Sequence, residues 1–403
     1  MAKDSSDQFK IFKQGIVDLI SEDELRQKLA EGRPLRIKYG ADPSTPDLHL
    51  GHTVPLRKLK QFQDLGHQIV FIIGDFTARV GDPSQRSETR PMLSFDEVKQ
   101  NAKTYQDQVF RILDKKRTEV RYNSEWLDKL KPQDLLHLMS QYTVARLLER
   151  DDFRKRYESK QPIALIEFLY PLLQGYDYVQ VKADIEIGGT DQKFNLLVGR
   201  ELQKVWGQKQ QVVITFPLLE GTDGVRKMSK TFGNAIGIQE SPKEIFGKVM
   251  SIPDALVPRY YQYISGMAEE ECISVLTELK NAPRELKAKL AAQIVELYYD
   301  KEKAAQAREE FDRVFRDKQL PDEIEEVTLS IKQLSGGKMN VVDLLKESGL
   351  TSSKSEARRL VEQGGVKIDE KRISSAEDQI LLSNTQPVVV QCGKRKFARV
   401  KVK

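Results

Sequence analysis

Cysteine is scarce in this sequence, and long apolar runs are absent. Only Cys272 and Cys392 occur among 403 residues, and their wide separation argues against a disulfide framework. The strongest apolar run, residues 69–73, has the length of a buried strand and is far too short to span a bilayer. The first ten residues are polar and contain no signal-peptide core. We therefore expect a cytoplasmic globular protein that does not enter a membrane.

The chain also lacks a strong excess of one charge. Its formal net charge is +5, and its 39% hydrophobic and 31% charged residues are typical of a soluble globular protein. The basic groups gather near the end, where residues 393–403 contain six lysines and arginines and no acid. Taken alone, this block is more simply a solvated tail, although it can attract a phosphate backbone.

The first part of the chain alternates strand-like and helix-like segments. Residues 35–39 have a strand pattern, and a helix pattern runs from about Gly51 to a stop at Gly66. Residues 69–73 form the next strand pattern. A strand–helix–strand unit at this spacing implies a parallel sheet.

Helical patterns dominate the middle of the chain. Residues from about 95 to 185 are mainly helical and have the character of an insertion in the α/β domain, since residues 211–216 then resume the strand pattern. Residues from about 240 to 318 are helical again. Their clearest apolar stripe consists of Leu286, Leu290, Ile294 and Leu297, in a helix that Pro283 opens.

A glycine-containing linker at 335–337 precedes a compact segment of about 65 residues. Asn340 can cap its first helix, and Ser353 with Glu356 forms a capping-box signature for its second helix. An alternating, strand-like tail begins at residues 366–368.

The sharpest motif is the string Pro-Ser-Thr-Pro-Asp-Leu-His-Leu-Gly-His at residues 43–52. It follows a strand and enters a helix, so His49 and His52 lie near a helix N-terminus, which favours an anion. Gly51 permits close approach of a ligand, and two imidazoles can donate hydrogen bonds to phosphate oxygens as charge develops. A zinc pair is the alternative, but His67 and His137 supply no obvious further ligand spacing.

A second motif, Lys-Met-Ser-Lys-Thr, occupies residues 227–231 in a loop after 221–224. Lys227 and Lys230, with Thr231 beside them, suit a movable clamp on polyphosphate. A lysine pair in a loop is usually only solvated. The two strings together, however, resemble the paired signatures of the class I aminoacyl-tRNA synthetases, His-X-Gly-His and Lys-Met-Ser-Lys-Ser.

A third motif places Tyr170, Gln174 and Asp177 on one face of an expected helix. The stripe could simply face water, but strongly apolar neighbours predict a buried helix, in which polar groups need partners. A substrate can supply those partners. The string 187–192 follows, with glycines that allow a ligand to approach and with Asp191 and Gln192 as polar groups.

From about residue 33 onward, the chain resembles the bacterial tyrosyl-tRNA synthetase family. The resemblance implies that Tyr170, Gln174 and Asp82 bind the ammonium group of tyrosine and that Asp177 accepts a hydrogen bond from its phenol. It also implies that Asp191 holds the ATP ribose and that Gln192 lies beside the tyrosine carboxylate. The expected tyrosine-binding residues are Lys38, Tyr39, Thr77, Asp82, Tyr170, Gln174, Asp177 and Gln192. The expected ATP-binding residues are Asp42, Pro43, Gly51, Gly189, Asp191, Met228 and Ser229, and the expected catalytic residues are His49, His52, Lys227, Lys230 and Thr231.

Lys38 departs from the best-known branch of this family, in which a tyrosine at that position also binds the phenol. With Tyr39 one place later, the sequence resembles the second bacterial branch, which has Lys-X-Gly-X-Asp-Pro. The second hydrogen bond to the phenol therefore has no assigned donor or acceptor.

Residues 355–368 resemble the core of the S4 RNA-binding domain. The resemblance makes the basic tail an expected RNA-facing surface, with phosphate contacts that position the RNA. The expected RNA-binding residues are Arg358, Arg359, Lys367, Lys394, Arg395 and Lys396.

The expected fold is a Rossmann-type parallel-sheet catalytic domain with a helical insertion at about 95–185, then a helical domain and a small α+β S4-like domain. The expected boundaries are 1–238, 239–334 for an anticodon-binding domain, and 338–403. We expect ATP as a substrate with Mg²⁺, no tightly bound cofactor, no protein-held metal, L-tyrosine and tRNA-Tyr as partners, and a homodimer. The alternatives are a tryptophan enzyme, a non-catalytic RNA-binding protein on the same fold, and a small-molecule nucleotidyltransferase.

Overall fold

The computed structural model describes residues 4–43, 47–84, 93–265, 267, 269–315, 324–334, 336–383, 386–393 and 396–403. The chain divides into two compact units, residues 1–307 and 308–403. Each unit has its own sheet and its own core. No helix in these described ranges is long and apolar enough to cross a membrane.

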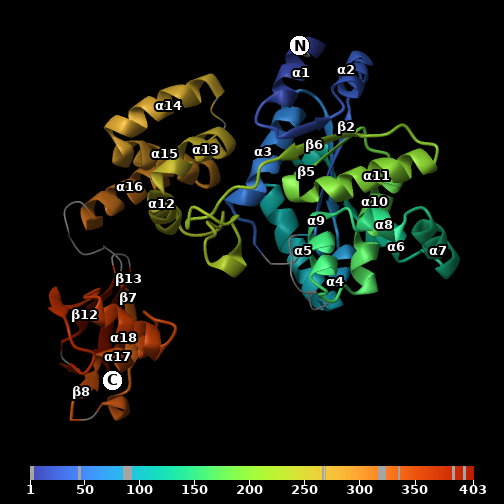
Figure 1. The fold of residues 1–403 in the computed structure, drawn as a ribbon. Helices are drawn as coiled ribbons and strands as arrows, with labels where there is room; N and C mark the ends of the chain where they lie inside the picture. Colours follow the sequence, from blue (N-terminus) through green and yellow to red (C-terminus); the bar gives the residue numbers. More distant parts are fainter. Residues whose placement is uncertain are drawn as a thin grey trace. The chain divides into compact units, whose positions relative to one another are not determined.

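A six-stranded sheet in the order β1-β6-β5-β2-β3-β4 forms the centre of the first unit (Figure 1). Strands β2 to β6 are parallel, and β1 is antiparallel to β6. The strands are β1 Asp18–Ile20, β2 Arg36–Ala41, β3 Gln68–Ile73, β4 Thr118–Tyr122, β5 Ile185–Gly189 and β6 Val212–Phe216. The predicted parallel sheet is confirmed. Strands β1 and β4 were not anticipated, because β1 has three residues and β4 is only half-buried, so neither has a strong apolar pattern.

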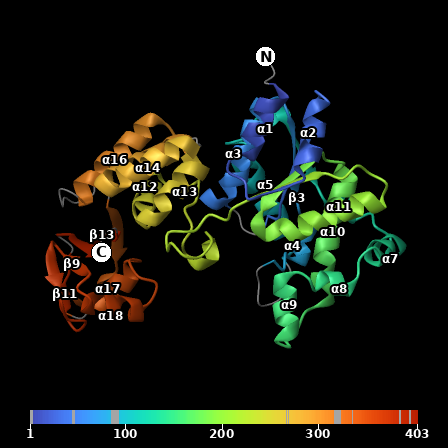
Figure 2. The ribbon, with the colours of Figure 1, turned by 45° about the horizontal axis from the view of Figure 1, so that its top comes forward.

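Two crossover helices place the functional segments on this sheet. Helix α3, Leu50–Asp64, joins β2 to β3, and helix α11, Lys193–Val205, joins β5 to β6. The two connections step in opposite directions along the sheet, and such connections are right-handed, so α3 and α11 cover opposite faces (Figure 2). Between β2 and β5 the direction of the connections reverses. The carboxyl ends of these two strands therefore border a crevice of the kind that binds ligands in open α/β sheets.

Helix α10, Leu165–Val181, packs against α11 on one face of the sheet. Val70 and Ile72, which alternate along β3, share an apolar core with side chains of both helices. The remaining helices of the first unit are α1 Ser5–Lys13, α2 Glu22–Ala30, α4 Thr77–Val80, α5 Phe95–Val109, α6 Ser124–Leu127, α7 Pro132–Ser140, α8 Val144–Leu147, α9 Asp151–Glu158, α12 Pro242–Met250, α13 Val257–Tyr260, α14 Glu269–Asn281 and α15 Pro283–Tyr298. The segment from 95 to 185 is thus mainly helical, as expected, apart from β4.

The apolar stripe of α15 is confirmed over most of its length. Leu286, Leu290 and Ile294 are buried, and Pro283 is the first residue of the helix. Leu297, in the last turn of the helix, is 38% exposed and lines a cavity, so the buried stripe ends before it.

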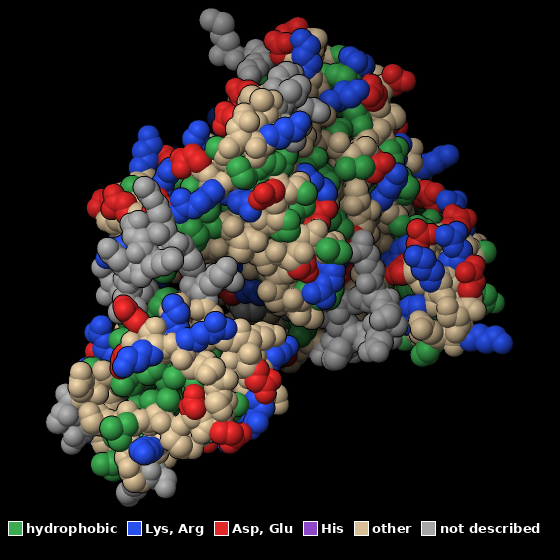
Figure 3. Space-filling view, turned by 60° about the vertical axis from the view of Figure 1, so that its left-hand side comes forward, with side chains coloured by type: hydrophobic (Ala, Val, Ile, Leu, Met, Phe, Trp, Pro, Cys, Tyr) green, Lys and Arg blue, Asp and Glu red, His purple; other side chains and the backbone are tan. Residues whose placement is uncertain are grey.

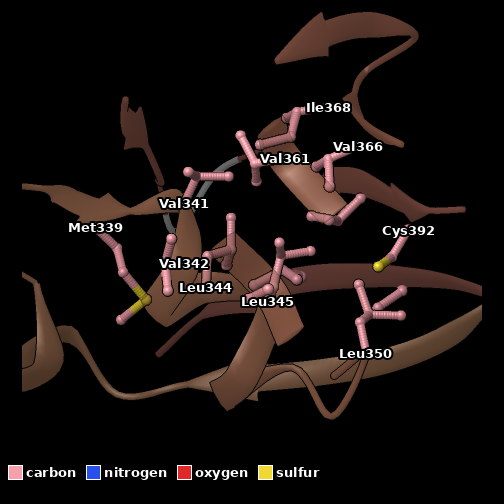
Figure 4. Close-up of a cluster of buried hydrophobic side chains, with 14 of the residues drawn as sticks. Met339, Val341, Val342, Leu344, Leu345, Leu350, Val361, Val366, Ile368 and Cys392 are labelled. Atoms are coloured by element: carbon pink, nitrogen blue, oxygen red, sulfur yellow. The ribbon is translucent and has the colours of Figure 1, made fainter. Parts of the chain in front are cut away.

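The second unit contains a five-stranded sheet in the order β10-β9-β12-β13-β7 and a separate pair, β11-β8. Its elements are β7 Glu325–Leu329, β8 Lys338–Asn340, α17 Val341–Glu347, α18 Lys354–Glu362, β9 Val366–Ile368, β10 Lys371–Ile373, β11 Gln379–Leu381, β12 Val388–Cys392 and β13 Lys396–Val402; helix α16, Lys301–Phe315, crosses the division between the units. Figure 4 shows the two short helices contributing Val341, Leu345 and Val361 to one buried apolar cluster. This small α+β unit agrees with the expected fold class.

Both predicted N-cap hydrogen bonds of the second unit are present, but the predicted return contact of Glu356 is made to a different residue. Asn340 Oδ1 accepts a hydrogen bond from Val342 N at 2.9 Å, and Ser353 Oγ accepts one from Glu356 N at 3.2 Å. The Glu356 carboxylate instead accepts hydrogen bonds from the backbone and hydroxyl of Ser352. Strand β7 lies before residue 338 and pairs with β13, so this sheet includes a strand upstream of the predicted linker.

Candidate active site

A cavity of about 350 Å³ lies at the carboxyl ends of β2 and β5. It brings together predicted residues that are spread between positions 38 and 229: Lys38, Tyr39, Asp42, His49, Gly51, His52, Thr77, Asp82, Tyr170, Gln174, Asp177, Gly189, Asp191, Gln192, Lys227, Met228 and Ser229. Pro43, Lys230 and Thr231 do not line it. The cavity occupies the crevice that the reversal of sheet connections creates.

His49 and His52 lie at the start of α3, as predicted. His49 is the residue before the first turn, and its backbone N–H donates to His52 Nδ1 at 3.3 Å while the two rings lie 3.8 Å apart. This hydrogen bond leaves the proton of a neutral His52 on Nε2. Burial lowers the pKa of His49 to about 2 and that of His52 to about 4, and the nearby lysine charges act in the same direction. Both rings are therefore neutral hydrogen-bond donors near pH 7.

Gly51 packs tightly against the first histidine. A Cβ at this position would lie 3.1 Å from two atoms of the His49 ring. The sequence suggested that this glycine admits a ligand. In the described structure its immediate role is to leave room for the imidazole.

The backbone on either side of the lysine loop is fixed. Gly237 forms a β-bridge with His49, and Glu220 forms one with Lys227. Asn234, which the sequence did not single out, donates to the carbonyl oxygens of Arg226 and Lys227 and accepts from Ser229 N at 2.8 Å. The first signature motif is thus bridged to the segment that follows the lysine loop, and the loop itself is bridged to the segment that precedes it.

The lysines of this loop already have carboxylate partners. Lys227 Nζ lies 3.1 Å from Asp191 Oδ2, and Lys230 forms an ion pair with Asp47. Thr231 lies in the short 3₁₀ turn Lys230–Phe232 and is exposed. Both lysine side chains remain about one-third exposed, so a polyphosphate can compete with these carboxylates.

Helix α10 directs its predicted polar face into the other end of the cavity. Tyr170 Oη donates to Asp42 Oδ2 at 2.8 Å, and Gln174 Oε1 accepts from Asn195 Nδ2 at 3.0 Å. Asp177 is only 3% exposed. The stripe therefore does not face water, which was the alternative that the sequence left open.

Two side chains that the sequence did not reveal hold Asp177. Trp126 Nε1 donates to Oδ1 at 2.8 Å, and Asn123 Nδ2 lies 3.4 Å from Oδ2. Burial raises the pKa of Asp177 to about 6, against the opposing effects of Lys38 and of these hydrogen bonds. Asp177 is consequently an oriented carboxylate acceptor near neutral pH.

Asp42 and Asp82 form a second acidic group in the cavity. Thr77 Oγ1 donates to Asp42 Oδ1 at 2.7 Å, and Gln192 Nε2 donates to Asp82 Oδ2 at 2.8 Å. Burial raises the pKa of Asp42 to about 7. A Cβ on Gly74 would lie 2.0 Å from Asp42 Oδ1, so this glycine makes room for the carboxylate. The group offers an ammonium ion two acceptors.

Lys38 forms a fully buried ion pair with Glu186 and points away from open solvent. Its Nζ lies 2.9 Å from Glu186 Oε1, and the two side chains are 1% and 2% exposed. The ammonium also lies 3.7 Å from the centre of the Tyr178 ring. A charged residue inside the apolar strand Ile185–Gly189 was a signal in the sequence for this site, whereas Trp126 and Asn123 gave none.

The predicted RNA-binding residues belong to the second unit. Arg358, Arg359 and Lys367 are exposed on α18 and β9, and Arg358 pairs with Glu377 at 3.2 Å. Lys396 Nζ donates to the carbonyl of Leu350 at 3.0 Å. Lys394 and Arg395 lie outside the described residues. Lysine, arginine and acidic side chains are interspersed on the face drawn in Figure 3, consistent with the small net charge.

No cluster of three or more histidine, cysteine or acidic side chains that could hold a metal occurs among the described residues. The arrangement instead combines neutral imidazoles and exposed lysines, which can stabilise phosphate charge, with a buried pocket that can hold an amino acid. Adenylate formation requires positioning and charge stabilisation, both of which these groups can supply.

Residues 30–316 match the family described as tRNA synthetases class I (W and Y), and residues 339–384 match the S4 domain. The chain therefore belongs to the class I tRNA synthetases, in the family of the tryptophan and tyrosine enzymes. Curated proteins of similar sequence include two tyrosine–tRNA ligases. The protein of Thermotoga maritima is 52% identical, over 98% of this chain and 97% of its own length, and that of Nitrosospira multiformis is 53% identical, over 98% of each.

Solved structures share the fold. A C-terminally truncated mitochondrial tyrosyl-tRNA synthetase of Aspergillus nidulans has a TM-score of 0.64 at 21% identity and covers 78% of this chain and 94% of its own. The tyrosyl-tRNA synthetase of Archaeoglobus fulgidus, complexed with L-tyrosine, has a TM-score of 0.61 at 21% identity and covers 76% of this chain and 100% of its own.

Proposed function

We propose that this chain is a tyrosine–tRNA ligase that activates L-tyrosine with ATP and transfers it to the 3′ end of tRNA-Tyr. The observation that carries the proposal is one cavity with two different ends. Neutral histidines and the lysine loop border one end, and the buried Asp177 acceptor lies at the other. An indole N–H could also donate to this carboxylate. What favours tyrosine over tryptophan is therefore the similarity, at 52–53% identity over nearly the whole chain, to proteins named tyrosine–tRNA ligase.

In the first step, the carboxylate of tyrosine attacks the α-phosphorus of ATP and pyrophosphate leaves. No side-chain nucleophile is needed, because the substrate supplies one. His49 and His52 donate N–H groups to the phosphate oxygens, and Lys227 and Lys230 exchange their carboxylate partners for polyphosphate. The terminal hydroxyl of the tRNA then attacks the carbonyl carbon of the mixed anhydride, which forms the tyrosyl ester and releases AMP. ATP brings Mg²⁺ with it as part of the substrate.

The substrate tyrosine enters along helix α10. Its ammonium group binds among Tyr170, Gln174 and Asp82, and its phenol donates to Asp177. A site with a buried acceptor discriminates strongly against a substrate that lacks the matching hydroxyl, because the acceptor then stays unpaired; the handling of tyrosine against phenylalanine by this class of enzyme is the standard example, with a ratio of about 10⁵.

We assign a separate role to each of three regions of the chain. Residues 1–238 carry catalysis, and the helices that follow residue 239 bind the anticodon. Residues 338–403, to whose sheet β7 also belongs, bind RNA through the exposed cations of α18 and β9. The two free cysteines suit a cytoplasmic enzyme. A homodimer forms through the segment 95–185, where apolar side chains lie exposed in the single chain: Leu136 (65%), Met139 (42%), Val144 (59%) and Leu165 (82%).

The test is ATP–pyrophosphate exchange with each of the twenty amino acids, followed by charging of purified tRNA. We expect exchange with tyrosine and transfer to tRNA-Tyr alone. Exchange with tryptophan in place of tyrosine would redirect the proposal to the tryptophan enzyme, and RNA binding without any exchange would leave only a binding protein.

A further inference from the structure

The buried ion pair between Lys38 and Glu186 lies in the floor of the cavity. These residues are direct neighbours in the register of the parallel strands β2 and β5, so the backbone fixes their distance. Their fully desolvated charges make this a costly arrangement. Its position at the cavity floor suggests a use beyond stability.

The surroundings hold the lysine in one place. Its ammonium lies over one face of the Tyr178 ring, at 3.7 Å from the centre. Helix α11 contacts that ring through Gly199, where a Cβ would lie only 2.2 Å from a ring carbon. Tyr178 directly follows Asp177 on α10. The Lys38 ammonium group is therefore held beside Asp177 and Tyr178, at the end of the pocket proposed for tyrosine.

Lys38 is the only cation among the described residues that line the amino-acid end of the cavity, whereas Asp42, Asp82, Asp177 and Glu186 are all there. Burial raises the pKa of Asp177, and among the neighbouring groups Lys38 lowers that pKa the most, which favours the ionised form. Without that charge, a desolvated carboxylate among other carboxylates would take up a proton.

We propose that the Lys38–Glu186 ion pair is a specificity-determining device, in which Glu186 anchors Lys38 and the Lys38 charge keeps Asp177 an ionised acceptor for the substrate's phenol. The inference rests on the tyrosine specificity proposed above. Lys38 is a positioning residue, since it acts through Asp177 and does not itself contact the phenol. The Lys38 charge thereby affects binding of the phenol only through the ionisation of Asp177.

The charged and titratable groups that face Asp177 are Lys38, Asp42, Asp75, Tyr170, Tyr178 and Glu186. Burial raises the pKa of Glu186, and Lys38 opposes that rise. Removing the lysine charge must move the ionisation of Asp177 to higher pH. Glu186→Gln removes the glutamate charge but keeps an oxygen that can accept the hydrogen bond from Lys38 Nζ. Lys38 then stays in place with its charge no longer offset, so the ionisation of Asp177 must move to lower pH.

The experiment measures kcat/KM in pyrophosphate exchange for tyrosine and for phenylalanine from pH 5 to 9 and follows their ratio. The ratio cancels the titration of ATP, of pyrophosphate and of the groups around the ammonium. Lys38→Met should move the midpoint of this ratio up by about one pH unit or more and lower the ratio at pH 7 at least about twofold. Glu186→Gln should move the midpoint down.

Lys28→Met is the matched control. Lys28 is also buried and lies 3.6 Å from a carboxylate, that of Asp184, but it does not line the cavity. This variant should leave the midpoint unchanged. An unchanged midpoint in Lys38→Met overturns the inference; if that variant does not fold, an unchanged or raised midpoint in Glu186→Gln does so. Absence of tyrosine exchange in the unmodified protein would instead overturn the proposed function.

Discussion

The two ends of the cavity are built in opposite ways. At the amino-acid end, Asp177 and Lys38 come from a helix and a strand, are almost fully buried and have fixed partners. At the phosphate end, Lys230 and Thr231 lie in a loop and are exposed, outside the cavity lining. A rigid, desolvated site suits selection of one side chain, whereas movable point charges suit a phosphate group whose charge changes during the reaction. The difference indicates that selection and catalysis are separate tasks of one cavity.

Loss of a mobile cation should have the largest effect. Lys230→Ala should slow adenylate formation by about 10²–10³-fold, the usual cost of one charge-stabilising group, and leave the KM for tyrosine nearly unchanged. Single-turnover formation of tyrosyl-adenylate measures the step. Lys209→Ala, at a lysine that is 89% exposed, is the control and should have no effect. Equal losses in both variants would remove the phosphate role of Lys230.

Removal of the fixed acceptor should act selectively. Asp177→Ala should lower kcat/KM for tyrosine about 10²-fold and leave that for phenylalanine nearly unchanged, because only tyrosine has a hydroxyl to lose its partner. Pyrophosphate exchange with both amino acids measures the ratio, and thermal unfolding verifies the fold. A parallel fall for both substrates would mean that Asp177 maintains structure and does not select.

Trp126, which donates a hydrogen bond to Asp177, should have a smaller influence on the preference for tyrosine. Trp126→Phe keeps the aromatic packing but removes the 2.8 Å hydrogen bond to Asp177. A hydrogen bond to a charged group contributes about 1.5–3 kcal/mol, so the tyrosine-to-phenylalanine ratio should fall roughly tenfold or more. If the ratio stays at the value of the unmodified protein, Trp126 does not orient the carboxylate.

The smallest predicted effect is a change of the tyrosine preference with pH, which should come from the amino-acid end of the cavity and not from the phosphate end. Asp177, with a pKa of about 6, loses its proton as pH rises, so the preference for tyrosine should increase a few-fold between pH 5.5 and 7. His49 and His52, with pKa values of about 2 and about 4, are neutral throughout this range and should add no step for either substrate. A common step near pH 6.5 with both amino acids would show that a histidine changes its charge.

Sequence patterns alone were enough to predict the parallel sheet, the helix caps, the small C-terminal unit and about half of the residues that line the cavity. These features depend on local patterns, such as apolar periodicity, turn glycines and two motifs with a direct phosphate-binding rationale. The extent of the short or half-buried strands β1 and β4 was not determined in this way, because their residues carry little periodic signal.

The hydrogen bonds and ion pairs between side chains that are distant in sequence depend on the tertiary structure. Lys38 and Glu186 are 148 positions apart and meet because β2 and β5 are neighbours in the sheet. Trp126 reaches Asp177 across 51 positions, and Lys230 reaches Asp47 across 183. Such contacts follow from strand order and side-chain packing, which no local pattern encodes. For that reason the sequence indicated a tyrosine pocket, and the fold assigned its lysine to the support of the acceptor.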